Sequence, residues 1–525
     1  MSDNKIPKYI GRITGRKIGE IFFRLPYNQR VDLGDLAIVQ DTDTGMKFYI
    51  RIVDISYGAE GADQVWFERT AGNLMLLDDS GVEDSLFEKE RRLYKMARCN
   101  LLGYLRNEKF YKPKTIPIHF SRVRQPSGED FHFLERLGAN LKIAHLRSGE
   151  SVLDLPIGIS SKSVVSHIGL FATTGMGKSN LMKRLAGAIL ESGNVGLLIF
   201  DPHGEYYDGG GEAHLKGLID HPLAGQNMCV YSSRKTVQMS NSLTISSAEI
   251  KPEDVNHIYE FSEAQQEALT AIYYRFGNEW LTSLRTMSIE ELSSQITSQG
   301  GFAESTMGVL KRRAESLLKQ KYINIDKGVS TSNNIFQKLK AGKVVLVDSS
   351  NLTTRDELLI SSVLCRTVFG HYRSMYSKPE EFKSALPILM VMEEAQRVLR
   401  KAGTSGANIF ARIAREGRKF KTGICAVTQQ PKLIDEELLS QFNTFLILGL
   451  ADESDRNIIR SSSKQDISEL GTEIQMLSPG EALITAPEAP FALPVKIDLY
   501  EDYLEQIKSL YENRGGAKSV DENFF

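Results

Sequence analysis

The stretch Leu170-Phe171-Ala172-Thr173-Thr174-Gly175-Met176-Gly177-Lys178-Ser179 runs from an apolar strand through a glycine-bearing loop into a Lys-Ser pair. The backbone N–H groups of such a loop can converge on nucleotide phosphates, while the lysine reaches the β- and γ-phosphate oxygens and the serine hydroxyl binds Mg²⁺. Ala172 replaces the first glycine of the usual G-x-x-x-x-G-K-[ST] spacing. Apolar residues at helical spacing, from Leu181 to Leu190, nevertheless supply the strand–loop–helix context that this motif requires.

We therefore predict an α/β enzyme that binds and hydrolyses ATP with Mg²⁺. The positive end of the helix that follows the loop adds to the attraction for phosphate. The predicted nucleotide-binding residues lie on the loop and in the first turn of this helix: Thr174, Gly175, Met176, Gly177, Lys178, Ser179 and Asn180. Lys178 is also predicted to be catalytic, and Ser179 to be a metal ligand.

Carboxylates follow two of the apolar strands that alternate with helical stretches after Val164, the pattern of a parallel sheet. Glu393 and Glu394 follow the run 388–392; we predict that Glu393 holds the Mg²⁺ hydration shell and that Glu394 deprotonates the attacking water. Asp201 follows the run 197–200 and is placed to join the metal site. A helix cap is the alternative role for Asp201.

The chain divides near residue 155. Before it, short β-like runs alternate with turn residues, which predicts a small barrel that serves assembly or partner docking. After it, we predict an ATPase core that a helical insertion splits in two. The predicted ranges are the barrel at 1–155, the core at 156–245 and 336–500, the insertion at 246–335 and a C-terminal tail at 501–525.

The charge balance does not favour nucleic-acid binding by the molecule as a whole, since the net charge is −2 and the pI is about 6.6. A ring with a basic channel fits this balance, and so does a protein that never contacts nucleic acid. The run 401–406 and Lys311-Arg312-Arg313 are candidate DNA contacts, although each is also typical of a solvated charged surface. Without a membrane-length apolar stretch or a signal sequence, we expect a cytoplasmic protein.

Several motifs together resemble the HerA branch of the HerA/FtsK ATPase superfamily, in the same order and along most of the chain. They are Ala172 to Ser179, Phe200-Asp201-Pro202-His203-Gly204-Glu205-Tyr206, Glu393-Glu394-Ala395, Ile413-Ala414-Arg415-Glu416-Gly417-Arg418-Lys419-Phe420 and Val427-Thr428-Gln429-Gln430-Pro431. The resemblance implies a RecA-like P-loop ATPase core with an N-terminal β-barrel and a helical insertion. It also implies a homohexameric translocase or helicase of double-stranded DNA, with a partner nuclease (NurA-like) on the barrel.

The resemblance further implies that Arg418 and Arg415 act as arginine fingers on the ATP of a neighbouring subunit and that Gln429 senses the γ-phosphate. From the residues alone, these arginines equally fit a solvated helix face. Gln396 stands where the family often has histidine, and Gln430 where it often has arginine. These departures leave an alternative open: an ATP-binding hexameric scaffold that activates a nuclease or a sirtuin-like NADase. The sequence does not choose between DNA repair and antiviral defence.

Overall fold

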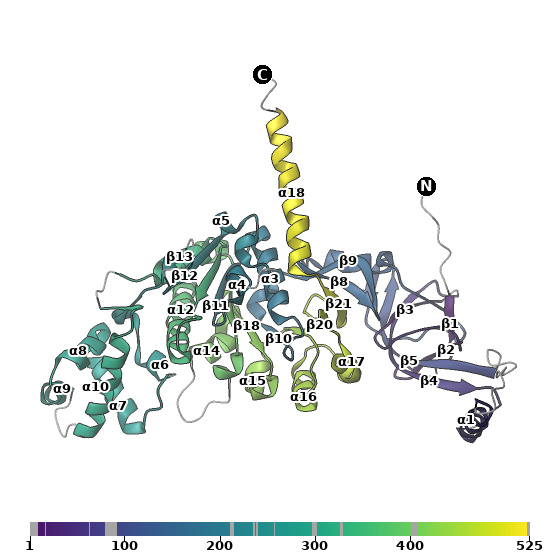
Figure 1. The fold of residues 1–525 in the computed structure, drawn as a ribbon, viewed down its shortest axis with the longest axis horizontal. Coiled ribbons are helices and arrows are strands. Elements are labelled where there is room, and N and C mark those ends of the chain that lie inside the picture. The colour runs from purple at the N-terminus through teal and green to yellow at the C-terminus, as the bar shows by residue number, and fades with distance from the viewer. Residues whose placement is uncertain are drawn as a thin grey trace.

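The computed structural model describes residues 9–15, 17–41, 43–61, 64–78, 92–210, 215–234, 237, 240–256, 258–296, 302–325, 329–400 and 408–521. Figure 1 shows a β-barrel, a broad α/β body and a helical lobe that follow one another along the long axis. The predicted fold class, a RecA-like P-loop core with an N-terminal barrel and a helical insertion, is confirmed. Within the described ranges, no helix is both long enough and apolar enough to span a membrane.

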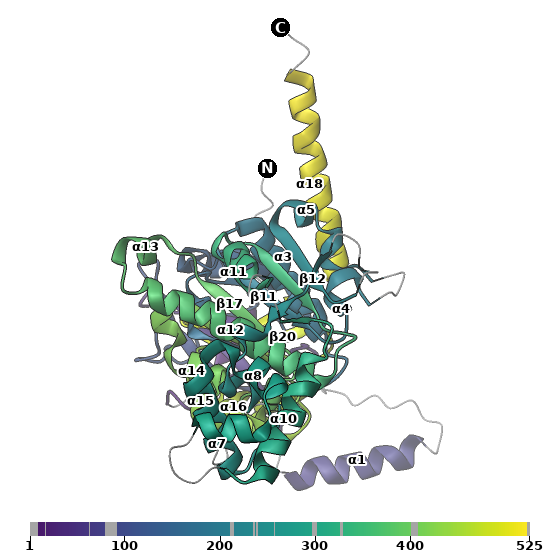
Figure 2. The same ribbon diagram turned by 90° about the vertical axis from the view of Figure 1, so that its left-hand side faces the viewer.

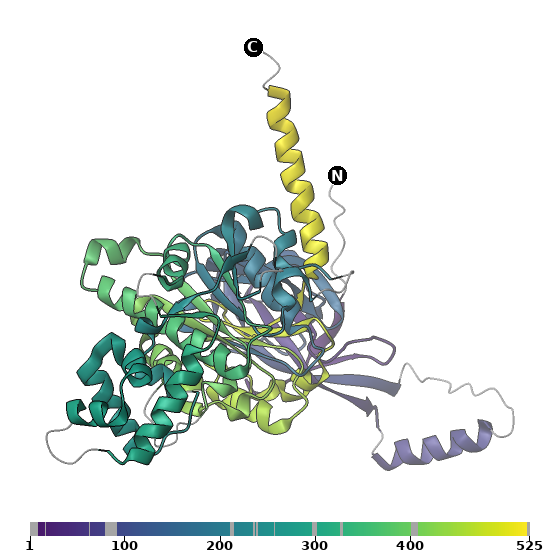
Figure 3. The same ribbon diagram turned by 60° about the vertical axis from the view of Figure 1, so that its left-hand side comes forward.

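The N-terminal barrel closes because its sheet pairs back on itself. Its strands follow the order β2-β1-β7-β3-β4-β5, and β5 pairs again with β2. Buried apolar side chains from alternate strand positions fill the interior, among them Phe23 and Ile50. The strand bounds are β1 (Tyr9–Ile13), β2 (Ile21–Pro26), β3 (Leu36–Gln40), β4 (Lys47–Ala59), β5 (Leu93–Arg106), β6 (Lys109–Tyr111) and β7 (Arg122–Arg124). Helix α1 (Gln64–Asp78), between β4 and β5, stands away from the barrel (Figures 2 and 3).

The barrel is shorter than the predicted range 1–155. Strands β8 (Leu141–Ser148) and β9 (Ser151–Ile159) belong to the large sheet of the core instead. Strand β8 hydrogen-bonds to β21 (Leu493–Ile497), which lies near the other end of the chain. Because that partner is so remote in sequence, no local pattern could have placed β8 and β9 in the core.

The core sheet places the acidic strand close to the phosphate-binding strand. It has twelve strands in the order β13-β12-β16-β11-β17-β18-β10-β19-β20-β21-β8-β9, and every pair from β13 to β19 is parallel. Strand β18 separates β10 from β17, so the ends of all three meet at one edge. The remaining bounds are β10 (Ile168–Phe171), β11 (Gly196–Asp201), β12 (Met228–Ser232), β13 (Ser240–Ser242), β16 (Val344–Asp348), β17 (Ile388–Met392), β18 (Thr422–Thr428), β19 (Thr444–Ile447) and β20 (Glu481–Thr485).

Both faces of this sheet are buried, which explains why its strands read as continuous apolar runs. Ile168 and Leu170 of β10 join one core with helix α3 (Lys178–Ser192), whereas Phe171 joins the core on the opposite face. The second face is covered by α12 (Thr354–Met375) and α14 (Ile409–Glu416). Shorter helices connect these elements: α4 (Glu205–Asp208), α5 (Ala224–Asn227), α11 (Ser332–Lys340), α13 (Pro379–Ser384), α15 (Glu436–Leu439), α16 (Glu453–Ser462) and α17 (Gly471–Met476).

The helical insertion is closed by a two-stranded parallel pair. Strand β14 (Ile245–Ser246) pairs with β15 (Ile323–Asn324), and the described residues between them form five α-helices and two short 3-10 helices. The α-helices are α6 (Pro252–Val255), α7 (Glu263–Phe276), α8 (Trp280–Thr286), α9 (Ile289–Ile296) and α10 (Glu304–Leu318). Trp280 is buried at their centre, where its indole N–H donates to the Ile250 carbonyl.

The C-terminal range predicted as a tail is mostly helix. Helix α18 (Tyr500–Asp521) packs its first turns on α3 and then projects away from the body (Figures 1 and 3). Its base is held by buried aromatic residues, since Tyr500 and Tyr503 lie in the same core as α3. A Cβ added at Gly187 would come within 2.8 Å of the Tyr503 ring, so a glycine is needed where the two helices meet.

Candidate functional site

A cleft of about 410 Å³ lies at the carboxyl ends of β10, β11, β17 and β18. Its lining combines the loop after β10 with the segment that follows β11 and with Glu393, Glu394 and Gln429. This volume lies within the range of small-ligand sites, and the place is the usual ligand edge of an open parallel sheet. Six of the seven predicted nucleotide-binding residues line the cleft. Met176 does not, because its side chain packs toward Gly449.

The loop after β10 adopts the conformation that a phosphate cradle needs. Gly175 and Gly177 have positive φ angles of 81° and 95°, which glycine adopts without strain. A Cβ at Gly175 would meet nothing within 4 Å, and at Gly177 only the backbone nitrogen of Gly480 at 3.8 Å. The space over the loop is therefore open. The residues present fit a polyphosphate.

Lys178 and Ser179 face carboxylates across this space. Burial lowers the pKa of Lys178, and the nearby charges of Glu393 and Glu394 counteract the effect. The Ser179 hydroxyl donates to Glu205 Oε2 at 2.6 Å. Asn180 anchors the start of α18 instead. Its side-chain amide donates to the Asp498 carbonyl and accepts from the Tyr500 N–H.

Asp201 stabilises a turn. It is fully buried, and its two carboxylate oxygens accept the backbone N–H groups of Gly204, Glu205 and Tyr206 at 2.8, 3.1 and 3.0 Å. This is the capping role that the sequence left open as the alternative. The turn brings Glu205 to Ser179, a contact that sequence analysis did not predict. The only sequence signal for this contact was one acidic residue four positions beyond Asp201.

Glu393 lies between two partners. The Tyr206 hydroxyl donates to Glu393 Oε1, and burial raises the pKa of Glu393 to about 7 in spite of Tyr206 and of the Lys178 charge. Glu394 comes next and has a left-handed backbone, with φ 50° and ψ 45°. Such a conformation costs about 1 kcal/mol or more in a residue other than glycine, and it recurs at functional sites.

Two glutamines complete the site. Gln396 Nε2 donates to Glu394 Oε2 at 2.5 Å, and Thr428 Oγ1 donates to Gln396 Oε1 at 2.6 Å. Gln429, next to Thr428, accepts a hydrogen bond from Thr174 of the phosphate loop at 2.5 Å. The predicted sensor therefore contacts the loop directly, and Gln396, noted in the sequence only as a departure, touches the predicted base.

Comparisons with known proteins agree with this geometry. Residues 141–368 match the family model described as "Helicase HerA, central domain". The chain is 28% identical over 431 residues to the "DNA double-strand break repair helicase HerA" of Saccharolobus solfataricus, with 80% of each chain covered. Over about four fifths of its length, the chain is similar to HerA-type P-loop ATPases.

The chain is also similar to other proteins. The protein of the same name from Pyrococcus furiosus is 25% identical, with 82% of this chain and 81% of the relative covered. Among solved structures, the bacterial conjugative coupling protein TrwB is 14% identical and covers 71% of this chain and 92% of its own, with a TM-score of 0.45.

The predicted arginine fingers lie at the opposite edge of the sheet. Arg418 precedes β18 and is exposed, and its charge adds to the burial that lowers the pKa of His167 to about 4 at the start of β10. The seven residues of β18 separate this edge from Gln429, a distance of about 20 Å. Arg415 is also exposed and pairs with Glu437 at 2.9 Å. Neither arginine lines the cleft of its own subunit.

The structure describes only one of the two candidate DNA contacts. The run 401–406 lies outside the described residues. In the other candidate, Lys311 Nζ donates to the Met287 carbonyl at 2.7 Å, and the Arg313 guanidinium lies 4.4 Å from the centre of the Tyr259 ring. Lys311 and Arg313 thus contact other parts of the helical insertion, although Arg313, like Arg312, is exposed.

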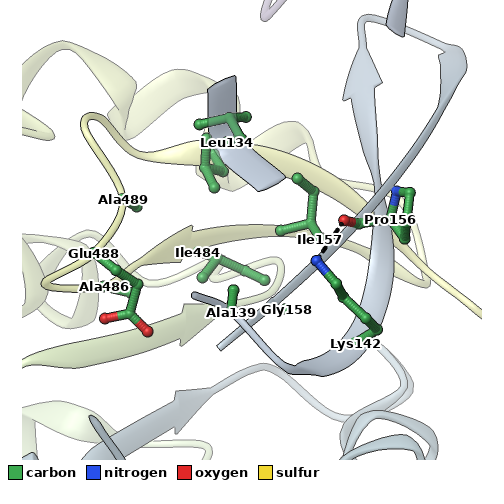
Figure 4. A pocket seen from close by; sticks show the side chains of 11 residues that line it. Leu134, Ala139, Lys142, Pro156, Ile157, Gly158, Ile484, Ala486, Glu488 and Ala489 are labelled. Carbon is green, nitrogen blue, oxygen red and sulfur yellow. Dashed lines mark hydrogen bonds between the residues drawn. The ribbon is translucent and has the colours of Figure 1, made fainter. Parts of the chain in front are cut away.

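A second pocket lies between β8–β9 and β20–β21 (Figure 4). It is lined mainly by apolar side chains such as Leu134 and Ile484. Its two charged residues have partners, since Lys142 donates to the Pro156 carbonyl and Glu488 accepts from the Ser160 N–H and the Ser163 hydroxyl. Both charged side chains of this second pocket are therefore already engaged in hydrogen bonds.

Proposed function

We propose that this protein is an ATP-dependent translocase or helicase of double-stranded DNA that works as a homohexameric ring. The observation that carries the proposal is the cleft itself, in which Lys178 and two carboxylates meet over an open phosphate cradle. The relatives named as DNA double-strand break repair helicases support DNA as the substrate. Moving DNA requires the energy of ATP hydrolysis, and this cleft has the groups for it.

In the proposed reaction, backbone N–H groups of residues 174–179 bind the phosphates and Lys178 neutralises charge on the γ-phosphate. Ser179 and Glu393 would hold Mg²⁺, with Glu205 and Asp201 beside them; the ion, when bound, neutralises charge on the phosphate oxygens. Glu394 accepts the proton of the attacking water. Gln429, already in contact with Thr174, is placed to respond when the phosphate loop is filled.

The hexamer is supported by where the arginines lie. Arg418 is too far from its own cleft to touch the ATP bound there, so it can serve as a finger only on the ATP of a neighbouring subunit. A guanidinium supplied in this way stabilises the charge that develops in the transition state. The arginine requirement would make hydrolysis depend on ring assembly.

The barrel is proposed to dock a partner enzyme, either a NurA-like nuclease or a defence effector such as a sirtuin-like NADase. Its closed sheet leaves few free strand edges, so a partner would bind its loops or outer surface. The names of the relatives favour DNA end processing over antiviral defence.

The test is the ATPase rate of the purified chain with and without linear duplex DNA, with its mass measured in the same buffer. We expect a hexamer whose turnover rises with DNA and vanishes in Lys178→Ala. Glu394→Gln should bind ATP and fail to hydrolyse it. A hexamer whose turnover ignores DNA, and which activates a partner effector even as Lys178→Ala, would favour the scaffold instead.

A further inference from the structure

Three polar side chains form a chain of hydrogen bonds that ends on the proposed catalytic base. Glu394 accepts from the amide of Gln396, whose oxygen accepts from the hydroxyl of Thr428. The hydroxyl oxygen of Thr428 in turn accepts the backbone N–H of Gln430 at 3.0 Å. Glu394 and Gln396 follow the end of β17, Thr428 ends β18, and these two strands lie side by side. We propose that Gln396 and Thr428 are positioning residues that hold Glu394 in the orientation needed to deprotonate water; this inference rests on the proposed function.

Each bond in the chain has only one possible direction. An ionised carboxylate can only accept hydrogen bonds, so the NH₂ group of Gln396 must face Glu394. The amide oxygen of Gln396 then faces Thr428, and the Thr428 hydroxyl must donate to it. The orientation of the whole chain thus follows from the charge at its end.

The chain rests on a rigid support. Thr428 is the last residue of β18 and is buried, and its carbonyl accepts the N–H of Ala172, where the phosphate loop begins. Its neighbour Gln429 accepts from Thr174 of the same loop. Glu394, by contrast, follows the end of β17 in a strained left-handed conformation. The chain of hydrogen bonds therefore ties Glu394 to the strand that contacts the start of the phosphate loop.

Only one oxygen of the base is used by this chain. Gln396 donates to Glu394 Oε2, so Oε1 is left to accept the proton of water. Without the amide, the carboxylate would rotate among several orientations, and few of them would suit proton transfer. Because the chain makes no contact with the phosphate cradle through Gln396, its loss should slow hydrolysis and leave ATP binding intact.

The experiment measures kcat, KM and ATP affinity of the purified protein with Mg²⁺ and duplex DNA. Gln396→Met and Thr428→Val keep the approximate shape of each side chain and remove its hydrogen bonds. We expect each to lower kcat about tenfold, the cost of losing a bond to a charged group, while KM stays within about twofold. The double variant should lose little more than either single one, since both break the same chain.

Thr428→Ser is the matched variant, because it removes only a methyl group and restores the hydroxyl. We expect it to recover most of the turnover lost in Thr428→Val. The opposite order, with valine active and serine impaired, would assign Thr428 a packing role and overturn the inference. Loss of ATP affinity in Gln396→Met and Thr428→Val would do the same.

The inference and the proposed function fail in different ways. If Glu394→Gln turns over ATP at the wild-type rate, the assignment of the base is wrong. If Glu394→Gln is inactive while Gln396→Met keeps the wild-type kcat, the base stands and the positioning chain is refuted. Circular dichroism of each variant shows whether a low rate reflects a folded protein.

Discussion

Glu473 should be far more important for stability than its exposed neighbour Glu469, although both pair with barrel arginines. Glu473 lies on α17 and accepts from Arg51 of β4 at 2.5 Å and from Arg147 of β8 at 3.2 Å. All three side chains are almost fully buried, with side-chain exposures of 6%, 1% and 5% respectively. This buried cluster joins the barrel to the ATPase core.

The substitution Glu473→Gln keeps the shape and one acceptor oxygen but removes the charge. Among the residues that the structure describes, Arg51 would then have no carboxylate partner, and Arg147 would have only Glu481, whose carboxylate is 3.9 Å away. Breaking a buried ion pair by removing one partner costs about 3 to 5 kcal/mol, and the retained acceptor places this change near about 3 kcal/mol. With a urea m-value of about 3 kcal/mol/M, the midpoint should fall by about 1 M.

Glu469→Gln is the matched control. Glu469 pairs with Arg98 of the barrel at 2.8 Å, but their side chains are 46% and 37% exposed. Such a surface pair contributes about 0 to 1 kcal/mol, so the midpoint should move by less than about 0.3 M. Urea unfolding followed by far-UV circular dichroism measures both variants. Equal shifts, or a Glu473→Gln midpoint within about 0.3 M of wild type, would refute the argument from burial.

Three further predictions concern the cleft. Burial raises the pKa of Glu393 to about 7, above its ordinary value of 4.5, so the folded state binds this proton more tightly than the unfolded state does. The free energy of unfolding should therefore fall by about 3 kcal/mol as pH rises from 4.5 to 7. In Mg²⁺-free buffer, Glu393→Gln should melt above wild type at pH 8 and close to it at pH 4.5; a gap independent of pH would contradict this. Gly177 has a φ of 95°, so Gly177→Ala should strain the phosphate cradle and weaken ATP binding about tenfold or more, as measured by calorimetry. The control is Gly61→Ala in the barrel, where φ is 67°, because it removes a glycine of positive φ away from the cleft. Lys178→Ala and Arg418→Ala should each be inactive alone. Rings assembled from a mixture of the two variants should regain part of the ATP turnover, since an intact cleft of one subunit can then meet an intact Arg418 of its neighbour. No recovery on mixing would argue against an arginine finger supplied by the neighbouring subunit.

Local sequence was sufficient where the signal lies in neighbouring residues. The strand–loop–helix pattern around Lys178 predicted both the phosphate loop and the helix α3. The apolar run 388–392 likewise predicted a buried strand that ends at two carboxylates. In both cases, backbone geometry and burial follow from a few consecutive side chains.

Where contacts join distant segments, local sequence was not sufficient. The contact between Glu205 and Ser179 was not predicted, because it joins the turn after β11 to the start of α3. Gln396 was read only as a departure from a family pattern. Its role depends on β18, which comes later in the chain and lies between β17 and β10.

The sequence by itself determined the class of the protein, because a phosphate loop and an acidic strand end are made by short segments whose conformation is local. Changes in apolar periodicity also indicated a barrel, a core and a helical insertion, although the predicted barrel range included two strands of the core sheet. Only the tertiary structure decided that β8 and β9 leave the barrel for the core sheet, that Glu473 pairs with arginines of two other strands, and that Thr428 supports Gln396. These contacts depend on strand order, and strand order is set by packing of the whole chain rather than by any one segment.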